Sequence, residues 1–368
     1  MAQATCKRVS SHPAPPTASS VAEDLLSHQY CSRRSNAEVT APLCFIGGRG
    51  GSQHVVKGWQ EGKLITKLRV YSGPWQIKAV RLWLSGDGDS EYKQFGEPGG
   101  SAWAEFAFQD GEVVTAMSLW GNGAGTRAGW IHFRTNKGRS FDYGMHDWPK
   151  KTEYPVNVGS GILVGAIYNA GADIDAHGYY FLDSPIARAR ATDVCYPNLT
   201  FDSHQITPIT LDSYSQRNTS PHPISWGFSG NQVAKQSQKW TSQIGNSFTV
   251  SLTVEAAVPT VVKASGQFGW QLSVVSTHEA AEEEAHSLTW TVGGTLQPSE
   301  AISLVALTRR GKLSIPYNST IVITLKNGAT FSFACSGTYE GLAYTGVEVT
   351  DAPTASRLNA KPKSYLTL

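Results

Sequence analysis

A glycine-rich segment near the middle of the chain has the residues best suited to bind a ligand. It reads Gly171-Ala-Asp-Ile-Asp175-Ala-His-Gly178, with an aspartate four positions after a glycine. Such a loop places one carboxylate beside several backbone N–H groups. A carboxylate accepts two hydroxyl protons and the amides donate to the hydroxyl oxygens, so the loop can bind adjacent hydroxyls of a sugar without a metal. The same spacing also occurs in ordinary turns, and both interpretations stay open at this point.

Motifs for catalysis are scarce. The chain has no G-x-S-x-G, H-E-x-x-H or P-loop sequence. Asp87-Gly-Asp89-Ser-Glu91 begins like a calcium loop, but Tyr92 and Pro98 occupy the positions that need Gly and Glu. Gly121-Asn-Gly-Ala-Gly125 does not open a helix, which indicates a turn and not a nucleotide site. We therefore expect neither an enzyme nor a bound metal or other cofactor.

The composition limits which binding partners we expect and where in the cell we expect the protein. The 368-residue chain has 31 basic and 29 acidic residues, and this near balance excludes a strong overall attraction to nucleic acid. No apolar run is long enough for a transmembrane helix, and the N-terminus has no apolar stretch typical of a secretion signal. We expect a soluble protein, either cytoplasmic or released by an unconventional route. Five widely spaced cysteines without a C-x-x-C pair indicate neither a disulfide framework nor a zinc site.

The elements that must position the glycine-rich loop are predicted to be strands. Between residues 43 and 185, short apolar runs such as Trp103–Phe108 alternate with glycine-rich turns. Short strands at intervals of roughly 8–12 residues predict a sandwich or a barrel-like prism. Six tryptophans are expected to fill its core rather than stack on a ligand: Trp75, Trp83, Trp103, Trp120, Trp130 and Trp148.

A change in composition predicts a second domain. After Asp183-Ser-Pro185, longer Ser- and Thr-rich strands replace the short ones. We expect an all-β chain of four segments: a disordered tail at 1–40, a first domain at 41–183, a second module at 184–355 and a C-terminal tail at 356–368.

An amphipathic hairpin is predicted at about 247–275. Its apolar residues are even-numbered on both sides of Pro259, and its Ser, Thr, Gln and charged residues are odd-numbered. Folding at Pro259 would bring Glu255 opposite Lys263 and give one apolar face. Each arm of about 12 residues spans roughly 30 Å at a tilt of about 40°, enough to cross a membrane as part of a multi-chain barrel. An ordinary half-buried hairpin in a soluble sheet explains the alternation equally well.

An acidic segment follows the second arm. It reads His278-Glu-Ala-Ala-Glu-Glu-Glu-Ala-His286, and the simpler interpretation is a solvated loop or short helix. The alternative is a pH trigger, because crowded carboxylates take up protons above their usual pKa and histidine becomes charged near pH 6.

The first domain resembles the jacalin-related lectin family, whose fold is a three-sheet β-prism. The similarity lies in Gly47-Gly-Arg-Gly-Gly51, Val80–Leu84, His132–Gly138, Gly161–Gly165 and the Gly171-x-x-x-Asp175 loop. It implies a monosaccharide site in which Asp175 is the carboxylate and the amides of Asp173, Ile174 and the Gly50/Gly51 turn are donors. Arg49 stands where many family members have an aromatic residue. Mannose-type glycans are the expected partners.

The second module resembles the pore-forming module of the aerolysin family, and the order of the two is that of natterin-like proteins. The similarity rests on the alternating arms, the apolar segment Val258–Val262 and the strands of Lys312–Leu325. It implies docking on glycosylated membranes, contact with lipid, homo-oligomerisation and insertion of the hairpin. The expected membrane-insertion residues are Phe248, Val250, Leu252, Val254, Val258, Val262, Phe268, Trp270 and Leu272. The rivals are a soluble lectin whose second domain only mediates oligomerisation, and a glycan-processing enzyme.

Overall fold

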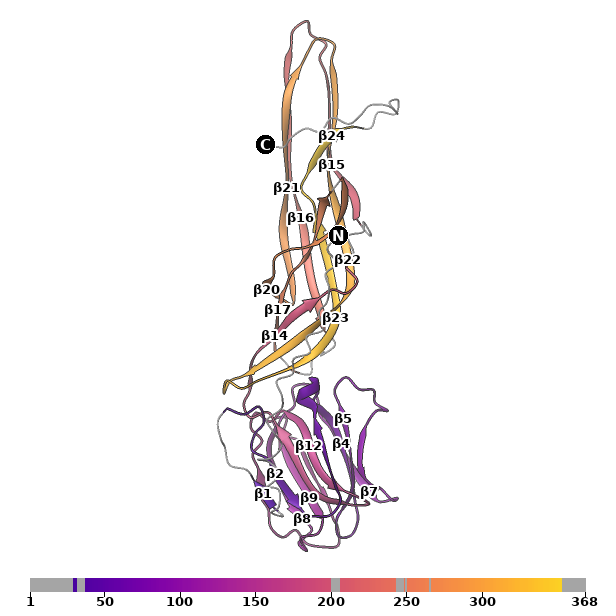
Figure 1. Cartoon of the computed structure of the whole chain (residues 1–368), viewed down its shortest axis with the longest axis vertical. Helices are drawn as coiled ribbons and strands as arrows, with labels where there is room; N and C mark the ends of the chain where they lie inside the picture. The colour runs from indigo at the N-terminus through magenta and orange to yellow at the C-terminus, as the bar shows by residue number, and fades with distance from the viewer. Residues whose placement is uncertain are drawn as a thin grey trace.

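The computed structural model describes residues 29–31, 37–199, 206–242, 248, 250–264 and 266–352. The molecule is elongated, with a squat β-prism at one end and a long β-lobe at the other (Figure 1). Apart from the 3₁₀ turn η2 (Gly58–Glu61), all regular structure in the described part is strand. The predicted all-β class is therefore confirmed. No described helix is long and apolar enough to span a membrane.

Three antiparallel sheets build the prism. Their strand orders are β1-β2-β13-β12-β3, β6-β5-β4-β7 and β10-β9-β8-β11. The strands are β1 (Gln29–Cys31), β2 (Cys44–Gly47), β3 (Ser52–Lys57), β4 (Ile65–Ser72), β5 (Ile77–Leu84), β6 (Lys93–Gly96), β7 (Ala102–Ala107), β8 (Val114–Gly121), β9 (Ala128–Thr135), β10 (Ser140–Gly144), β11 (Tyr154–Val156), β12 (Leu163–Ala170) and β13 (Ile174–Phe181). The predicted tail at 1–40 thus includes β1, and its residues 1–28 and 32–36 lie outside the described residues, as do 353–368.

The six tryptophans expected in the core differ in exposure, and Trp130 is half-buried. Trp83 and Trp120 are buried, as expected of core residues. Trp75, Trp103 and Trp148 are instead 53%, 52% and 40% exposed. The prediction that these three fill the core was wrong, because aliphatic and phenylalanine side chains such as Leu68, Leu82, Ile131 and Phe133 already fill the space between the sheets.

The lobe is one long twisted sheet with the order β20-β17-β14-β22-β23-β16-β21, to which β15 and β24 add by pairing with β22. Its strands are β14 (Ile186–Cys195), β15 (Ile206–Arg217), β16 (Ile224–Ser242), β17 (Leu252–Ala256), β20 (Ser276–Glu279), β21 (Ala281–Leu296), β22 (Ala301–Leu325), β23 (Thr330–Tyr344) and β24 (Glu348–Asp351). A separate two-stranded sheet is formed by β18 (Pro259–Ala264) and β19 (Gln267–Leu272). Alternation in the long strands gives one covered face, as in β22, where Ile321, Ile323 and Leu325 are buried.

The predicted hairpin exists, but it does not fold at Pro259. Pro259 pairs with Leu272, and Ala264 pairs with Gln267, so the chain reverses between Ala264 and Gln267. Further along, Ala256 pairs with Ser276 and Thr253 with Glu279. The predicted contact between Glu255 and Lys263 is therefore wrong. Alternation reports which face a residue occupies and not its partner across the hairpin, and for this reason it could not fix the register.

The acidic segment is neither a loop nor a helix, because it forms β20 and the start of β21. The backbone N–H of Glu279 donates to Glu282 Oε1 at 2.6 Å and lowers the pKa of Glu282, with further lowering by Gln238 and His278 against the opposing effect of burial. Glu283 instead lies near Lys235, at 3.4 Å. Crowding therefore does not raise the pKa of Glu282, as the pH-trigger alternative required of that residue.

Two cysteines differ from expectation. Cys44 in β2 and Cys195 at the end of β14 are both in the disulfide form. Wide spacing in the sequence therefore concealed a cross-linking role that we did not predict.

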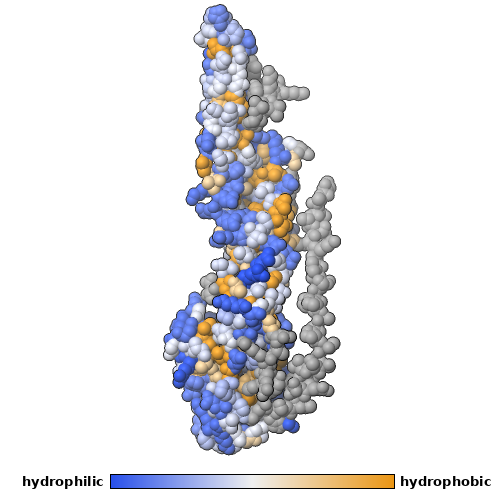
Figure 2. Space-filling view, turned by 90° about the vertical axis from the view of Figure 1, so that its left-hand side faces the viewer, coloured by the Kyte–Doolittle hydropathy of each residue, from blue (hydrophilic) through white to orange (hydrophobic). Residues whose placement is uncertain are grey.

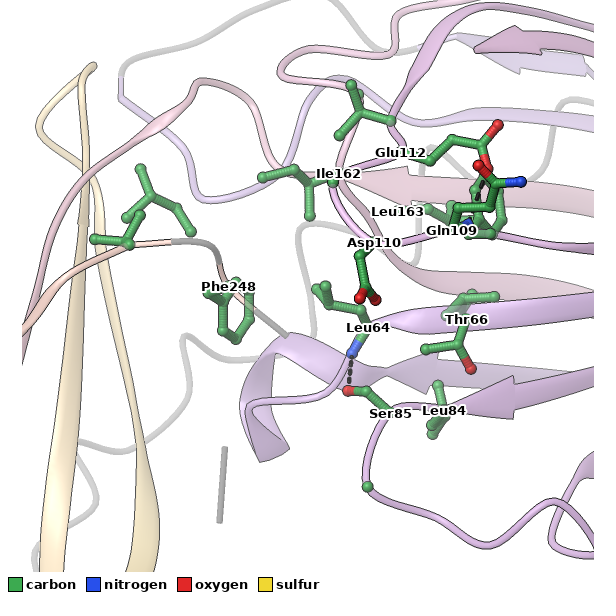
Figure 3. A pocket seen from close by; sticks show the side chains of 18 of the residues that line it. Leu64, Thr66, Leu84, Ser85, Gln109, Asp110, Glu112, Ile162, Leu163 and Phe248 are labelled. Atoms are coloured by element: carbon green, nitrogen blue, oxygen red, sulfur yellow. Dashed lines mark hydrogen bonds between the residues drawn. The ribbon is translucent and has the colours of Figure 1, made fainter. Parts of the chain in front are cut away.

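The two domains meet at polar contacts and at a cavity that is lined by both apolar and polar residues. Asn327 Nδ2 of the lobe donates to Asp183 Oδ2 of the prism at 2.7 Å. A cavity of about 590 Å³ lies between the domains. Phe248 enters it from the lobe and faces Leu64 and Ile162 of the prism (Figure 3). Phe248 thus belongs to the domain interface, outside the hairpin strands.

Candidate functional site

The two glycine-rich loops, Gly47–Gly51 and Gly171–Asp175, meet at the end of the prism that lies farther from the lobe. β12 begins at the lobe side, where Leu163 lines the interdomain cavity, and its eight residues run to Ala170 at the opposite end. The loop between β12 and β13 therefore carries Asp173 and Asp175 at the outer end of the molecule. There the N–H of Gly48 donates to the backbone oxygen of Asp175 at 2.6 Å, which joins the two loops.

The first glycine loop packs directly on the Asp175 carboxylate. A Cβ on Gly50 would lie 2.7 Å from Asp175 Oδ1, and one on Gly51 would lie 2.5 Å from Oδ2 and 2.7 Å from the backbone of Ala170. Gly51 also has a φ of +71°, which side chains rarely adopt. Glycine is thus required at both positions so that the backbone can approach the carboxylate. Gly50, Gly51 and Asp175 are brought together as the sequence predicted.

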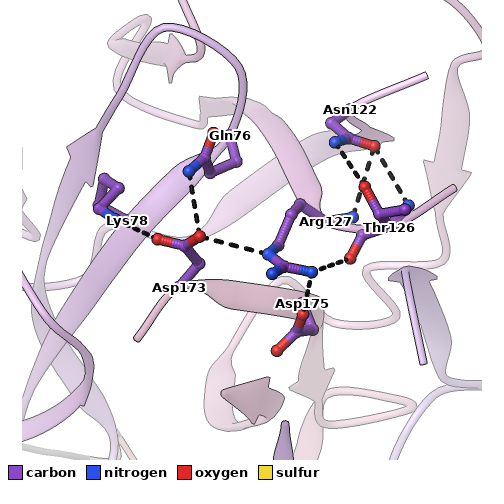
Figure 4. Close-up of polar contacts among 7 residues, drawn as sticks. All are labelled: Gln76, Lys78, Asn122, Thr126, Arg127, Asp173 and Asp175. Atoms are coloured by element: carbon purple, nitrogen blue, oxygen red, sulfur yellow. Dashed lines mark hydrogen bonds and ion pairs between the residues drawn. The ribbon is translucent and has the colours of Figure 1, made fainter. Parts of the chain in front are cut away.

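Arg127 was not predicted and sits at the centre of the site. Its Nη1 is 2.6 Å from Asp175 Oδ1 and its Nε is 3.3 Å from Asp173 Oδ2 (Figure 4). The Asp175 side chain is only 5% exposed, whereas that of Arg127 is 37% exposed. Arg127 therefore covers one carboxylate oxygen of Asp175 from the solvent side.

Asp173 has a different role from the one expected. Its carboxylate is paired with Lys78, accepts a hydrogen bond from Gln76 Nε2 at 3.1 Å and also contacts Arg127 (Figure 4). Ile174 is fully buried, so only its backbone can serve a ligand. The side chain of Asp173 thus fixes the loop between β12 and β13 against the other two sheets.

A glycine-rich turn between β8 and β9 presents Arg127. Asn122 Oδ1 accepts hydrogen bonds from the backbone N–H groups of Ala124 and Thr126, at 3.1 and 3.3 Å. Arg127 Nη1 also donates to Thr126 O at 2.8 Å. The segment Gly121–Gly125 is a turn, as predicted, but its position beside the Asp175 loop was missed. A basic residue directly after a glycine-rich turn is the only signal in the sequence that indicated it.

The electrostatic environments of the two aspartates differ. Burial raises the pKa of Asp175 above its ordinary value; Arg127 opposes this effect and Asp173 adds to it. For Asp173, burial acts in the same direction, but hydrogen bonds from Lys78 and Arg127 outweigh it and lower the pKa. His177 lies two residues beyond Asp175, and burial lowers its pKa to about 3. Asp175 is therefore the group that gains a proton first as the pH falls from neutral.

Because the pKa of Asp175 is raised, sugar binding by this site is expected to begin to weaken, as the pH falls, at a pH above the ordinary aspartate pKa of about 3.9. A protonated Asp175 accepts fewer hydroxyl protons than the carboxylate. Because its pKa is raised in the folded state, protonation of this group favours the fold, and its contribution to stability is lost only as the pH rises through that pKa. Affinity measured from pH 7 to 4, with thermal melting at each pH, should show binding lost before unfolding. Binding and melting that fall together would contradict the assignment.

The hairpin of β17–β20 forms a second candidate functional element, stored against the lobe. β17 pairs in parallel with β14 through Leu252, Thr253 and Val254. Val261 and Trp270 are buried and pack on Gly311, where a Cβ would lie 2.7 Å from the Trp270 ring. In Figure 2, hydrophobic residues on the visible face are scattered over the lobe. The stored hairpin thus keeps its largest apolar side chains covered.

Apolar packing holds the hairpin more strongly than charge. Arg190 pairs with Glu255, but both side chains are more than a third exposed. Lys263 Nζ lies 2.6 Å from Glu348 Oε1, also at the surface. Surface ion pairs of this kind contribute about 0–1 kcal/mol each, whereas burying a large apolar side chain such as Trp270 contributes about 3 kcal/mol. An apolar environment that replaces the lobe could therefore release the hairpin.

The expected membrane-insertion residues occupy several different environments. Leu252, Val254, Phe268, Trp270 and Leu272 lie in the hairpin strands and pack on the lobe cluster or its edge. Val258 lies between β17 and β18, and Phe248 and Val250 line the interdomain cavity. Val262 is on the face opposite Val261. The expectation of one continuous even-numbered face is thus wrong for this stored form, because the pairing register shifts between β17–β20 and β18–β19.

Comparison with known proteins identifies the families of both domains. A family model described as "Jacalin-like lectin domain" matches residues 43–180. The crystal structure of lamprey immune protein matches with 33% sequence identity, a TM-score of 0.76 and coverage of 86% of this chain and 99% of that one. The chain belongs to the natterin-like family. The resemblance drawn from the sequence is confirmed: a jacalin-type lectin domain precedes an aerolysin-type module.

Solved lectin structures are also similar to part of this natterin-like protein. Malaysian banana lectin is 26% identical over 38% of this chain and 94% of its own, with a TM-score of 0.32. The artocarpin–mannotriose complex is 17% identical over 40% of this chain and 98% of its own, with a TM-score of 0.31. No curated protein matches the chain by sequence.

Proposed function

We propose that this natterin-like protein binds mannose-type glycans on a membrane through its lectin domain, oligomerises and inserts its amphipathic hairpin as part of a transmembrane β-barrel. The glycan site is Asp175 with the Gly50/Gly51 turn, and Arg127 is a partner of that carboxylate. No enzymatic step is part of the proposal. A soluble lectin whose second domain only mediates oligomerisation is the alternative.

The observation that carries the pore proposal is the position of the hairpin in the chain. It is inserted between β16 and β21, which pair with each other from Ile224↔Leu296 to Lys239↔Ala281. A hairpin joined to two long paired strands can lengthen that pair without breaking the rest of the sheet. Several chains would be needed to close a barrel and remove the unpaired edges.

The clustering of weak sugar-binding sites supports the proposed order, in which glycan binding precedes assembly. Single sugar contacts are weak, and an assembly that presents several lectin domains at once raises the overall avidity. Glycan binding therefore concentrates the monomers where assembly takes place.

Vesicles with and without a mannose-terminated glycolipid test this function. The proposal expects the protein to co-sediment with the glycolipid vesicles and to release a trapped dye from them, while free mannoside prevents both. A plain oligomeric lectin would co-sediment and cross-link the vesicles but leave the dye inside.

A further inference from the structure

Two exposed tryptophans lie on loops at the end of the prism that carries the glycan site. Trp75 lies in the turn between β4 and β5, where the N–H of Gly73 donates to Gln76 O at 2.9 Å, and Trp148 lies in the loop that follows β10. The two residues are 53% and 40% exposed. Their ring centroids are 6.3 Å apart and the ring planes are tilted by 41°. Two indole rings from different sheets thus meet at the surface, and each keeps a large part of its area exposed.

The turn that carries Trp75 is tied to the glycan site by its next residue. Gln76 Nε2 donates to Asp173 Oδ2 at 3.1 Å (Figure 4). Lys78, at the start of β5, is paired with the same carboxylate. Because Asp173 lies two residues before Asp175, the turn of Trp75 and the loop of the glycan site hold each other in place.

The loop of the second tryptophan is held on two sides. The N–H of Asp147 donates to Pro74 O at 2.9 Å, which ties this loop to the turn between β4 and β5. On the other side, a Cβ on Gly123 would lie 2.6 Å from Lys151 Cδ, so the loop packs closely on the turn that presents Arg127. Both rings are therefore fixed beside the glycan site before any ligand binds.

We propose that Trp75 and Trp148 form a second subsite, which binds a further ring of an oligosaccharide whose first ring is held at Asp175. This inference rests on the proposed glycan binding. One face of a sugar ring presents C–H groups, which pack favourably on an exposed aromatic surface. An indole side chain has only two rotatable bonds, and both indoles stand on anchored loops, so a ligand that packs on them loses little affinity to the ordering of the protein.

The surroundings of the two rings favour a sugar over a lipid chain. The side chain of His146 is 54% exposed and belongs to the same loop as Trp148, and Lys151 further along that loop is also exposed. A sugar combines an apolar ring face with hydroxyl groups that form hydrogen bonds. Aromatic rings bordered by polar side chains match both features.

Trp75→Ala and Trp148→Ala should each weaken binding of mannotriose by about 2- to 10-fold and leave binding of methyl mannoside unchanged, as measured by calorimetry. A further ring is present only in the longer sugar, so only the affinity for that sugar should change. Trp75→Phe and Trp148→Phe keep an aromatic face and should each lose less affinity than the matching alanine variant.

Tyr92→Ala is the matched control and should change neither affinity. Tyr92 is an aromatic residue of the same domain that is 44% exposed. It lies in the connection between β5 and β6, where Ser85 and Asp87 line the interdomain cavity at the opposite end of the prism. Thermal melting of every variant reports the fold, and where an alanine variant melts lower than the wild type, the phenylalanine variant provides the comparison.

Indole fluorescence provides an independent measurement, because covering an exposed indole ring shifts its emission to shorter wavelength. Mannotriose should produce this shift in the wild type and not in the double variant Trp75→Phe/Trp148→Phe, and methyl mannoside should produce it in neither. A shift that persists in the double variant would come from another tryptophan and would contradict the subsite.

The calorimetric results separate the subsite from its alternatives. Equal loss of affinity for both sugars, or no loss for either, would overturn it. Unchanged sugar affinities with weaker binding to bare phosphatidylcholine vesicles would make the pair a lipid contact instead. Wild-type protein that binds neither sugar would overturn the proposed glycan binding at Asp175, on which the subsite depends.

Discussion

An Asp175→Asn variant is expected to lose glycan binding by about 100-fold or more while it keeps its fold. Two hydrogen bonds from sugar hydroxyls to a charged acceptor contribute about 1.5–3 kcal/mol each, and about 1.4 kcal/mol corresponds to tenfold in affinity. Asparagine has nearly the same shape, so no cavity forms. The guanidinium of Arg127 loses its ion pair with Asp175 in this variant, but its side chain is 37% exposed, so water can solvate it. Titration with methyl mannoside and thermal melting measure the two effects.

Asp147→Asn is the matched control for this experiment. Asp147 is an exposed aspartate at the same end of the prism, joined to the turn of Trp75 through Pro74. It should bind the monosaccharide as the wild type does. Undiminished binding by Asp175→Asn would move the sugar site away from the two glycine loops.

Ala264→Lys is expected to abolish membrane permeabilisation, whereas Gln267→Lys is expected to permit it. The two residues are direct partners in the stored hairpin, and both are exposed. If the even-numbered residues of the inserted hairpin face lipid, Ala264 faces lipid and Gln267 faces the aqueous lumen. A lysine near the middle of a barrel's lipid face costs about 2–4 kcal/mol, and every subunit would bear that cost. A lysine in the lumen instead adds positive charge that favours anions. Dye release and ion selectivity are the measurements.

Because the two positions lie side by side on the stored surface, the soluble proteins provide their own control. Both variants should bind mannoside and melt as the wild type does. Equal dye release by both folded variants would mean that this hairpin does not line the pore. Dye release by Ala264→Lys alone would mean that the two faces are assigned the wrong way round.

The sequence predicted the part of the glycan site that lies in its motif. Asp175, Gly50 and Gly51 come from loops with recognisable glycine spacing, and the structure brings them together. Lys78 and Arg127 come from the other two sheets of the prism and meet the site only after folding. Their distance in the sequence leaves no local pattern, which is why they were missed.

The hairpin shows a different limit of sequence analysis. Alternation located the amphipathic segment, because faces repeat with a period of two. The same alternation did not predict that the chain reverses between Ala264 and Gln267, because the packing of Val261 and Trp270 on the lobe selects the register of the stored hairpin. The exposed tryptophans show the same limit of sequence analysis. Their aromatic character predicted burial, but the position of a residue at the end of a strand decides whether the core has room for its side chain.

Electrical recording across a planar bilayer that contains a mannose-terminated glycolipid is the most direct test of the proposed pore. The proposal predicts discrete, uniform steps of conductance after the protein is added, with none when free mannoside is present. A bilayer that is demonstrably coated with the protein and stays at its baseline conductance would contradict pore formation, and the oligomeric lectin would then be the correct description.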